Sequence, residues 1–380
     1  MKAPFLRSVH VRNFKAIRDS GAVRLTPLTV FIGNNGSGKS GLIEALETLQ
    51  TLVMYGVDAA MQMWRGIEHV RNKTAVVRAV RSTAGIERSS KPISFKIRGR
   101  DFRESFAAEV VLNERHNTNE LFLERQSVRL GRHRSERRDQ GAVITQADSR
   151  SSPRFPAGGS WMDGPVGHYV CSWQFANLWP ARMGDPLPQT RMRGGIRLAK
   201  DGANIAEFLL DLRTRDLAAF EGLVEALRHV LPYAKDVQPA ATTELERTVY
   251  LQLSEAEFKV PGWLLSTGTL RLLALLALLR HPEPPPVIFI EEIENSLDPR
   301  TIHLLVDEIH RVVESGVSQV IVATHSPYLL DLLPLETIVL VERIDDEPVF
   351  SRPADDAALR KWAKEFSPGQ LYTMNRMGRR

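Results

Sequence analysis

The order of apolar and polar residues predicts short strands around one long helix in the first part of the chain. Polar and apolar residues alternate over residues 5–11, and residues 28–32 form a continuous apolar run, as expected for two β-strands. Residues 40–54 carry apolar side chains at helical spacing, so a helix is expected after the second strand. Further strand-like runs are residues 23–25, 93–97, 107–112, 121–130, 168–173 and 248–253, and residues 203–231 have a helical pattern.

The last third of the chain alternates helices with continuous apolar strands. Strands that are apolar on both faces and alternate with helices are typical of a buried parallel sheet. Asp345 and Asp346 lie between the last two strands, where consecutive aspartates favour a turn, so we interpret them as a turn and not as a metal site. The expected elements are helix 268–279, strand 287–290, helix 299–313, strand 319–323, helix 328–333 and a hairpin of strands 337–342 and 349–351.

The apolar strand at 28–32 leads directly into a glycine-rich segment, GNNGSGKS, which matches the pattern G-x-x-x-x-G-K-[ST]. Glycines in such a turn let backbone N–H groups point at phosphate oxygens, and the following helix presents its positive N-terminal end. Lys39 is expected to bind the β- and γ-phosphates of ATP, and the Ser40 hydroxyl is expected to bind Mg²⁺. The residues of this expected nucleotide site are Gly33, Asn34, Asn35, Gly36, Ser37, Gly38, Lys39 and Ser40.

Acidic residues and a histidine follow two of the apolar strands. A nucleotide site needs a carboxylate near Mg²⁺ and a group that orients the attacking water, and we assign these roles to Glu291 and Glu292. His325 follows the strand at 319–323, which we expect to neighbour the Glu292 strand, so we expect its imidazole to contact a γ-phosphate. The alternatives are that the two acids cap a helix and that the histidine has a capping or packing role.

The composition indicates a globular protein in a reducing compartment. Of 380 residues, 43% are hydrophobic and 25% are charged, which is ordinary for soluble proteins. Cys171 is the only cysteine, so no internal disulfide can form. The N-terminus lacks the apolar core of a signal peptide, and the longest apolar run, residues 272–279, is too short to cross a bilayer. We therefore expect a cytoplasmic protein without a membrane partner.

Basic residues are concentrated between Arg125 and Arg154, although the net charge of the whole chain is only +5. This segment contains eight arginines and three acidic residues, together with glycine, serine, glutamine and proline but few apolar residues. Its composition predicts a mobile insertion. Three interpretations stay open: a solvated loop without a partner, a surface that binds DNA, and a surface that docks an acidic protein.

Two further motifs complete a resemblance to the ABC-type ATPases. The sequence LSTGTLR resembles the ABC signature, which is normally Leu-Ser-Gly-Gly followed by Gln or Glu. The resemblance implies that Ser266 and the backbone of Gly268 contact the γ-phosphate bound by a second subunit, so that ATP lies between two heads. The sequence NSLD resembles the D-loop, which implies that Asp298 lies at the same dimer interface.

The separation of these motifs is similar to that in the RecF, SMC and OLD (overcoming lysogenization defect) group. A long segment separates Lys39 from Ser266, whereas Glu291 follows Ser266 closely. In the ATPase subunits of transporters the signature is usually much nearer the phosphate loop. The segments VRNFKAIRDS and VIVATHSP also look like the stand-alone AAA family ATPases of that group. The chain after His325 is too short for the Toprim domain of OLD-type nucleases, so we expect no nuclease domain.

The chain departs from the family pattern at several positions. Thr267 replaces the first glycine of the signature, and Thr269 replaces its Gln or Glu. Glu291 stands where most ABC proteins have aspartate. We interpret these changes as marks of the OLD-like branch. For the glutamine of the Q-loop, which the family uses at the nucleotide site, we choose Gln174.

The resemblance implies an α/β fold: a P-loop NTPase head of ABC type with a mixed sheet, an antiparallel β subdomain and an inserted helical lobe. The arginine-rich insertion, at about residues 125–160, is expected to belong to the first half of the head. The expected regions are 1–180 for the N-terminal half of the head, 181–260 for the helical lobe and return strands, 261–345 for the C-terminal half with the signature, acidic strand and histidine, and 346–380 for a final hairpin strand and helix.

Together these features predict a Mg²⁺-dependent ATPase that forms a dimer or higher oligomer around ATP. We expect it to control DNA or a separately encoded effector such as a nuclease. The resemblance implies roles in DNA repair, chromosome maintenance or anti-phage defence, of which we favour defence. The alternatives are a scaffold that ATP stabilises with little turnover and, against the spacing of the motifs, the ATPase subunit of a transporter.

Overall fold

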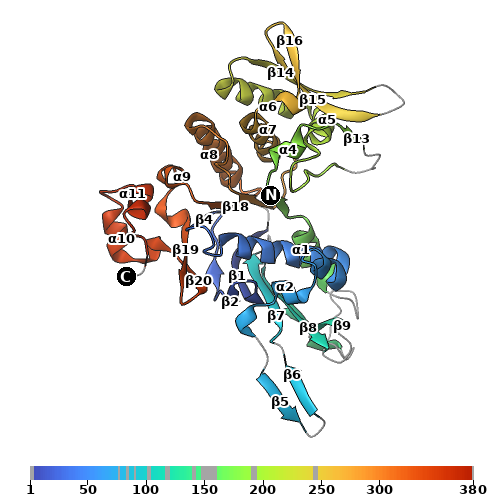
Figure 1. Ribbon diagram of the computed structural model, residues 1–380, viewed down its shortest axis with the longest axis vertical. Coiled ribbons are helices and arrows are strands. Elements are labelled where there is room, and N and C mark those ends of the chain that lie inside the picture. The colour runs from blue at the N-terminus through green and yellow to red at the C-terminus, as the bar shows by residue number, and fades with distance from the viewer. Residues whose placement is uncertain are drawn as a thin grey trace.

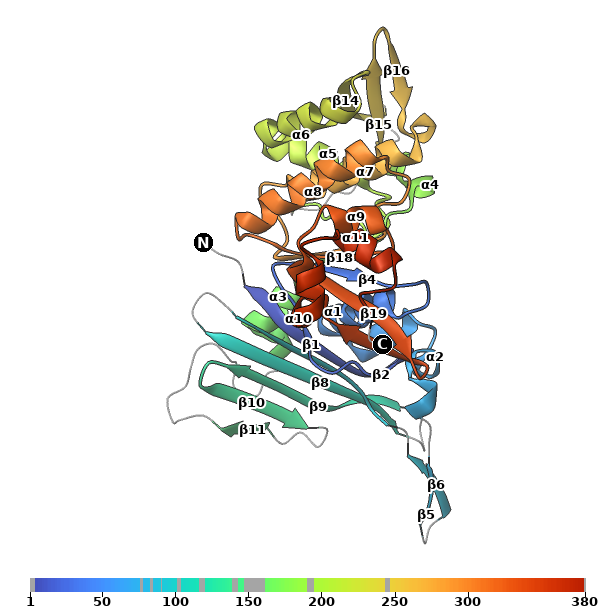
Figure 2. The ribbon, with the colours of Figure 1, turned by 90° about the vertical axis from the view of Figure 1, so that its left-hand side faces the viewer.

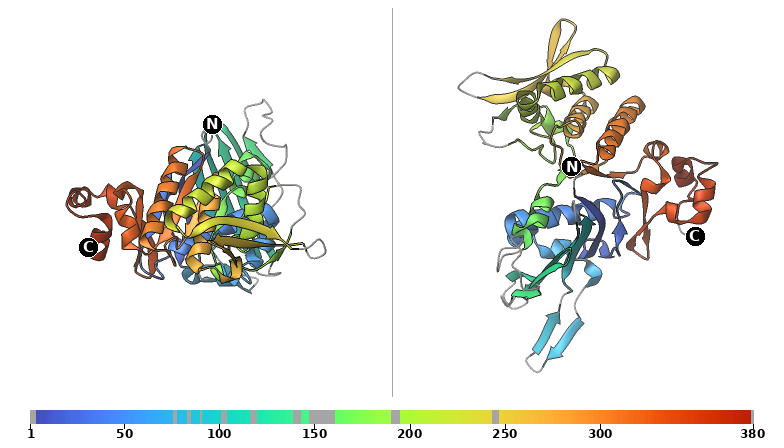
Figure 3. Two further views of the ribbon diagram at one scale, coloured as in Figure 1. Left: turned by 90° about the horizontal axis from the view of Figure 1, so that it is seen from above. Right: turned by 180° about the vertical axis from the view of Figure 1, so that it is seen from behind.

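The computed structural model describes residues 4–75, 78–82, 85–89, 91–100, 104–115, 120–138, 143–146, 161–189, 195–242 and 247–378. Two β-sheets enclose the long helix α1 (Lys39–Gln62), and further helices cover the other face of the first sheet. An inserted lobe and the hairpin of β5 (Arg78–Ser82) and β6 (Gly85–Ser89) lie at opposite ends of the molecule (Figure 1). The last helices project to one side of the first sheet (Figure 3).

The first sheet has six strands in the order β12-β17-β18-β4-β19-β20. All neighbouring pairs are parallel except β19 and β20, which form an antiparallel hairpin, so the sheet is mixed. Because β17, β18 and β4 are parallel neighbours, their carboxyl ends meet at one edge. The strands are β4 (Leu28–Ile32), β12 (Gln174–Ala176), β17 (Val287–Glu291), β18 (Gln319–Thr324), β19 (Ile338–Ile344) and β20 (Glu347–Ser351).

The central strands are apolar throughout because both of their faces are covered. Successive side chains of a strand point to opposite faces of the sheet. Phe31, Phe289 and Ile321 pack in a core with α1 and the second sheet. Neighbours such as Val30 and Ile290 pack in the other core, with α7 (Thr267–Leu279) and α8 (Pro299–Glu314). Each of these strands therefore joins two hydrophobic cores.

The second sheet is antiparallel, and one of its faces covers α1. Its eight strands follow the order β11-β10-β9-β8-β7-β1-β2, and β3 also pairs with β1 (Figure 2). In β7, Ile93, Phe95 and Ile97 are buried, whereas Arg98 is exposed, as expected for a sheet with one solvated face. The strands are β1 (Phe5–Phe14), β2 (Ile17–Asp19), β3 (Val23–Arg24), β7 (Ile93–Arg100), β8 (Ser105–Arg115), β9 (Glu120–Leu130), β10 (His133–Arg138) and β11 (Val143–Gln146).

The inserted lobe combines two helices with a four-stranded antiparallel sheet, whose order is β13-β15-β14 with β16 paired to β15. Buried residues of this lobe share a core with α7 and α8, so the lobe is packed directly on the helix that carries the signature. Its elements are β13 (Leu187–Pro188), α5 (Ile205–Arg215), α6 (Leu217–Val230), β14 (Ala234–Ala241), β15 (Thr248–Glu255) and β16 (Phe258–Pro261).

The remaining helices are short and connect the larger elements. Among the described residues, no helix combines the length and the apolar character that a membrane span needs. The α-helices are α2 (Ile67–Val70), α3 (Pro165–Cys171), α4 (Pro180–Met183), α9 (Pro327–Asp331), α10 (Ala357–Trp362) and α11 (Pro368–Thr373). The 3-10 helices are η1 (Lys73–Ala75), η2 (Trp161–Asp163), η3 (Gly262–Leu264), η4 (Leu335–Thr337) and η5 (Pro353–Asp355).

The strand expected at residues 168–173 is wrong, because helix α3 occupies this part of the chain. Pro165 stands at the start of the helix, where its fixed φ angle is favourable and its missing N–H is not needed. Val166, Tyr169 and Val170 are all buried, and their spacing is that of one helix face. The short apolar run was compatible with either element, and the preceding proline marked the helix.

The mobile insertion expected at about residues 125–160 is also wrong for the part that the structure describes. Residues up to Arg138 belong to β9 and β10, and Arg134 pairs with Arg129 across the two strands. Val128 and Leu130 are buried on the covered face of the sheet, and Arg129 between them is exposed on the other face. Residues 139–142 and 147–160, including Arg150 and Arg154, lie outside the described residues.

The two aspartates between the last strands form the tight turn of the hairpin β19–β20. Asp345 and Asp346 have φ angles of 49° and 65°, and Ile344 pairs with Glu347 on either side of them. Aspartate tolerates such left-handed conformations better than most residues because its short side chain can bond locally. The prediction of a turn is therefore confirmed.

Candidate functional site

The phosphate loop connects β4 to α1, and glycines determine its shape. Gly36 and Gly38 have φ angles of 77° and 110°, a region that residues with side chains rarely adopt. A Cβ on Gly33 would lie 2.1 Å from the carbonyl oxygen of Val341, so close packing against β19 requires glycine there. The N-cap residue of α1 is Gly38, which has no side chain to occupy the first N–H groups of the helix. These groups can therefore bind an anion, and the loop fits the phosphates of ATP.

Lys39 is folded back onto the loop. Its Nζ donates to the backbone carbonyls of Gly33 at 2.5 Å and of Asn34 at 3.1 Å. Burial lowers the pKa of Lys39, and the negative charges of Glu294 and Glu292 oppose this shift. The ammonium group therefore bonds to two loop carbonyls and feels the charge of two carboxylates. A bound phosphate can take the place of the carbonyls as its hydrogen-bond acceptor.

Ser40 and Glu291 meet where α1 begins and β17 ends. The Ser40 hydroxyl hydrogen-bonds to Glu291, and the side-chain amide of Asn177 donates to Glu291 Oε1 at 3.4 Å. Burial raises the pKa of Glu291, while the bond from Ser40 and the charge of Lys200 act in the opposite direction. Hydroxyl, carboxylate and amide oxygens are the hard donors that Mg²⁺ prefers.

A Mg²⁺ ion at this position would need ligands beyond the protein. Within the part of the chain that the structure describes, no group of three or more His, Cys, Asp or Glu side chains could hold a metal ion. A P-loop protein does not require such a group, because phosphates and water fill most of the positions around Mg²⁺. The pair of Ser40 and Glu291 beside the phosphate loop fits this kind of site.

Glu292 directly follows β17 and is fixed by its backbone. Its N–H donates to Ala323 of β18 at 2.8 Å, and its carbonyl accepts from Arg271 of α7 at 2.6 Å. Its φ angle of 51° turns the chain, so Glu292 is exposed although the preceding Glu291 is buried. Its carboxylate accepts a hydrogen bond from the side chain of Asn295. An exposed carboxylate on a fixed backbone beside Lys39 is suited to orienting a water molecule.

Ser266 and Gly268 lie at the start of helix α7. Ser266 is the N-cap residue, and its Oγ accepts from the Thr269 N–H at 3.1 Å and lies 2.8 Å from the Thr269 hydroxyl. A Cβ on Gly268 would lie 2.5 Å from the carbonyl oxygen of Ser296, so α7 packs closely on the segment that leads to Asp298. Asp298 in turn caps the start of α8. These residues therefore have local structural roles in addition to those expected at a dimer interface.

The structure brings Asn177, and not Gln174, to Glu291. The Gln174 side chain is buried in β12, where its amide donates to the carbonyls of Phe175 and Leu198. Asn177 comes immediately after β12, which is the parallel neighbour of the Glu291 strand. Asn177 is therefore a better candidate than Gln174 for the Q-loop role. Little in the sequence marked Asn177, because the strand before it has only three residues.

His325 and Glu294 are brought together after β18 and β17. His325 is exposed, and its Nδ1 lies 3.3 Å from Oε1 of the largely buried Glu294. Glu294 was not singled out from the sequence, because it follows two acids that already accounted for the expected chemistry. It is a third carboxylate at this edge of the sheet.

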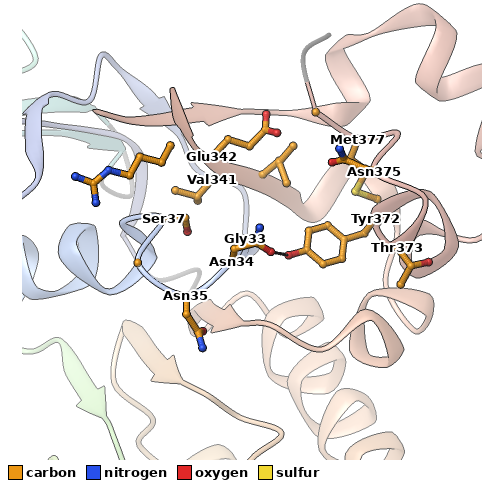
Figure 4. A pocket seen from close by; sticks show the side chains of 14 residues that line it. Gly33, Asn34, Asn35, Ser37, Val341, Glu342, Tyr372, Thr373, Asn375 and Met377 are labelled. Atoms are coloured by element: carbon orange, nitrogen blue, oxygen red, sulfur yellow. Dashed lines mark hydrogen bonds between the residues drawn. The ribbon is translucent and has the colours of Figure 1, made fainter. Parts of the chain in front are cut away.

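A pocket of about 680 Å³ lies beside the phosphate loop, between the loop, β19 and residues 372–378 (Figure 4). The Tyr372 hydroxyl of α11 donates to Asn34 Oδ1 at 3.1 Å, the contact that is dashed in Figure 4. At the start of α11, the Gly369 N–H donates to Asp331 of α9 at 2.6 Å. Helix α11 thus connects the phosphate loop to the helix that follows His325.

The chain is similar to known proteins over different parts of its length. A model of the AAA_21 family, described as "AAA domain, putative AbiEii toxin, Type IV TA system", matches residues 28–331. Two curated relatives are both named "DNA replication and repair protein RecF". The protein from Synechococcus sp. (strain JA-2-3B'a(2-13)) is 44% identical over 48 residues, and that from Thermosynechococcus vestitus (strain NIES-2133 / IAM M-273 / BP-1) is 42% identical over 48 residues. Each match covers only 13% of this chain and 13% of the relative.

Solved structures of Smc heads share the fold over most of the chain. One is an Smc head bound to the C-winged helix domain of ScpA, with a TM-score of 0.56 and 14% identity over 92% of this chain and 97% of that chain. Another is an Smc head with an extended coiled coil, bound to the C-terminal domain of ScpA derived from Pyrococcus furiosus. Its TM-score is 0.51, with 12% identity over 92% of this chain and 96% of that chain. The expected α/β fold of an ABC-type head with a mixed sheet is thereby confirmed.

Proposed function

The chain belongs to the AAA_21 family, and from this premise we propose that it is a switch that binds and hydrolyses ATP and dimerises around it. Its resemblance to the ABC-type P-loop ATPases of the RecF and SMC group is confirmed. The observation that carries the proposal is that Lys39, Glu291 and Glu292 lie at or beyond the carboxyl ends of β4 and β17, two parallel strands on either side of β18. This edge of an α/β sheet is where such proteins bind ligands.

In the proposed mechanism each side chain has one task. Lys39 and the loop N–H groups bind the phosphates, Ser40 and Glu291 would hold Mg²⁺, and the Asn177 amide donates to Glu291. When bound, Mg²⁺ neutralises negative charge that develops on the phosphate oxygens. Glu292 accepts a hydrogen bond from the attacking water and so directs its lone pair at the γ-phosphate.

A second copy of the chain would complete the site. The Ser266 hydroxyl contacts Thr269 at the start of its own helix, and neither Ser266 nor Gly268 lines the pocket beside the phosphate loop. In the proposed dimer, the start of α7 from one subunit covers the phosphates bound by the other subunit. ATP bridges both subunits only in this closed state, so its binding energy favours closure.

A separately encoded partner protein is part of the proposal. Two of the structurally similar Smc heads are bound to domains of ScpA, which supports a head that acts through another chain. The family description names a toxin, and the RecF relatives are named for DNA replication and repair. We accordingly propose a role in anti-phage defence or DNA repair, with an effector such as a nuclease.

Removal of Mg²⁺ tests the proposed hydrolysis. With excess EDTA, release of phosphate from ATP is expected to fall to the background rate, because Ser40 and Glu291 can act on the phosphates only through the ion. Ser40→Ala is expected to raise the Mg²⁺ concentration that gives half-maximal activity by about tenfold. Ser315→Ala, which removes a hydroxyl at the end of α8, serves as the control and should leave this concentration unchanged. Full activity in the presence of the chelator would contradict the proposed site.

A scaffold that ATP stabilises with little turnover is the second candidate. The observation that favours it is the bond between the hydroxyls of Ser266 and Thr269. Thr269 replaces the Gln or Glu of the ABC signature, and its hydroxyl competes with a phosphate for Ser266. A comparison of ATP-dependent dimer formation with ATP turnover separates a switch from a scaffold.

The solvated face of the eight-stranded sheet is a candidate surface for DNA. A shallow groove of about 940 Å³ on this face is lined by six basic side chains and one acidic side chain, Glu109. Figure 2 shows the antiparallel strands β8, β9 and β10 side by side in this sheet. Guanidinium and ammonium groups gathered on one face of a sheet suit the phosphates of a nucleic acid backbone. The six basic residues are Arg7, Lys96, Arg98, Arg129, Arg132 and Arg134.

Neutralising arginines on this face is expected to weaken binding of duplex DNA. The combined change of Arg129, Arg132 and Arg134 to glutamine should reduce affinity about tenfold or more in low salt. It should also lower the slope of log affinity against log salt by about two to three units. Fluorescence anisotropy with a labelled duplex over a salt series measures both quantities. The control replaces Arg213 and Lys259 of the inserted lobe by glutamine and should leave DNA affinity unchanged. A wild-type affinity for DNA that does not depend on salt concentration would contradict the hypothesis.

A further inference from the structure

Glu294 makes three contacts with the segment that carries His325. Its Oε1 accepts hydrogen bonds from the Thr324 hydroxyl at 2.7 Å and from the backbone N–H of His325 at 2.9 Å. The same oxygen lies 3.3 Å from His325 Nδ1. One carboxylate oxygen therefore accepts two hydrogen bonds from consecutive residues and also lies near the ring of the second.

The environments of the two partners are unequal. The Glu294 side chain is only 9% exposed, whereas the His325 side chain is 47% exposed. The second oxygen of Glu294, Oε2, is buried and has no hydrogen-bond partner among the described residues. A buried carboxylate oxygen without a hydrogen-bond partner destabilises the fold, which points to a role for Glu294 beyond packing.

We propose that Glu294 is a positioning residue that fixes the ring of His325, with Nδ1–H donated to the carboxylate and Nε2 left for the terminal phosphate. The inference rests on the proposed function, because it assigns a supporting partner to the histidine of that site. A carboxylate that receives Nδ1–H fixes both the orientation and the tautomer of an imidazole. When the ring also takes up a proton on Nε2, that N–H can donate to a phosphate oxygen, and the carboxylate at Nδ1 balances the positive charge of the ring. Glu294 acts through His325 and does not itself touch the nucleotide.

The same carboxylate also acts on the phosphate loop. The negative charge of Glu294 opposes the effect that burial has on the pKa of Lys39. The charge of Glu294 therefore acts on Lys39, and its carboxylate contacts the segment of His325. In a purely structural role, Glu294 would only tie the end of β18 to the segment after β17. The two roles predict different results when His325 is absent.

Kinetics of single and double variants separate these roles. Glu294→Gln keeps an acceptor for Thr324 and the His325 N–H but removes the charge. It is expected to lower kcat about 10- to 100-fold with KM for ATP changed less than about threefold. Glu294→Gln combined with His325→Ala should be no more than about twofold slower than His325→Ala alone, because residues that act as a unit are not additive. Multiplication of the two single losses in the double variant would overturn the inference.

Glu308→Gln is the matched control for loss of a buried carboxylate. Glu308 lies on α8, and its side chain is 1% exposed. Its carboxylate forms ion pairs with Arg280 at 2.6 Å and with Arg311 at 3.0 Å. We expect this variant to melt at a lower temperature than the wild type but to keep kcat within about twofold. A fall in kcat that equals that of Glu294→Gln would mean that destabilisation, and not the position of the ring, explains both results.

A spectroscopic readout tests the contact independently of ATP hydrolysis. In the wild-type protein labelled with ¹⁵N-histidine, at about pH 8, His325 is expected to carry a proton on Nδ1. Free imidazole side chains prefer the proton on Nε2, so the two cases give different patterns in long-range ¹H–¹⁵N spectra. The signal is assigned by its loss in His325→Gln. A proton found only on Nε2 would overturn the inference even if the protein hydrolyses ATP, and a proton on Nδ1 would support it even if it does not.

Discussion

Replacing Glu292 by glutamine is expected to lower the steady-state turnover of ATP by roughly 100- to 1000-fold. Glutamine has the same shape and can still accept from Asn295, but without a charge it is a poor acceptor for the proton of the attacking water. Binding of ATP should stay within about twofold, because the phosphates are held by the loop, Lys39 and Mg²⁺. Phosphate release and equilibrium binding of a fluorescent ATP analogue measure the two effects separately.

The same variant distinguishes a switch from a scaffold. Glu221→Gln on the exposed face of α6 is the control for a change of one charge, and it should leave turnover unaltered. Unchanged turnover in Glu292→Gln would show that another group orients the water. Biological activity that survives in a variant without hydrolysis would favour the scaffold, because a switch must open again after each cycle.

The phosphate loop was predictable because its chemistry is carried by contiguous residues. Gly36, Gly38 and Lys39 act through backbone angles and a helix end, which are local properties. The apolar strand before the loop and the amphipathic helix after it are local as well, and both are present in the structure. Glu291 could be placed because the end of a buried parallel strand fixes where its side chain lies.

Contacts between distant segments could not be predicted in the same way. Asn177 reaches Glu291 only because β12 pairs with β17, and a strand of three residues leaves little periodicity to detect. Glu294 meets His325 because β17 and β18 are neighbours whose following loops converge. In each case the partner lies far away in sequence, and the strand order that joins the two is a property of the tertiary fold.

The arginine-rich segment shows how composition alone misleads. Arginine has a long apolar stem, and a strand with one covered face needs an apolar residue only at every second position. Val128 and Leu130 supply that face in β9, and Arg129 between them is exposed. The positional alternation was present in the sequence, but a count of charges over thirty residues does not register it.

The structure also explains which departures from the ABC signature the chain tolerates. Gly268 is retained where a Cβ would lie 2.5 Å from the Ser296 carbonyl oxygen. Thr269 replaces a longer polar residue without loss of hydrogen bonding, since its N–H and hydroxyl both contact Ser266. Thr267 is the first residue of α7, a position that is more permissive than the close approach at Gly268. The substitutions therefore spare the residue that fixes α7 against the segment before α8.

A mixture of two inactive variants is expected to regain ATP hydrolysis if each site is built from two subunits. Lys39→Ala removes a ligand of the phosphates, and Ser266→Arg puts a large cation at the proposed interface, so each variant alone should lose about 100-fold in turnover. In a mixed dimer the intact Ser266 of one subunit faces the intact Lys39 of the other. Equimolar mixing should give roughly a quarter of the wild-type rate per subunit, since half of the dimers are mixed and each has one intact site.

The control for this experiment mixes Lys39→Ala with Glu292→Gln. Both changes lie on the same side of the proposed site, because Lys39 and Glu292 of one subunit are near enough for the charge of Glu292 to act on the pKa of Lys39. Every dimer in that mixture has both sites damaged, so no activity should return. Recovery in the first mixture and not in the second would locate Ser266 on the opposite subunit from Lys39. Equal behaviour of the two mixtures would contradict a shared site and would leave ATP bound by each subunit on its own.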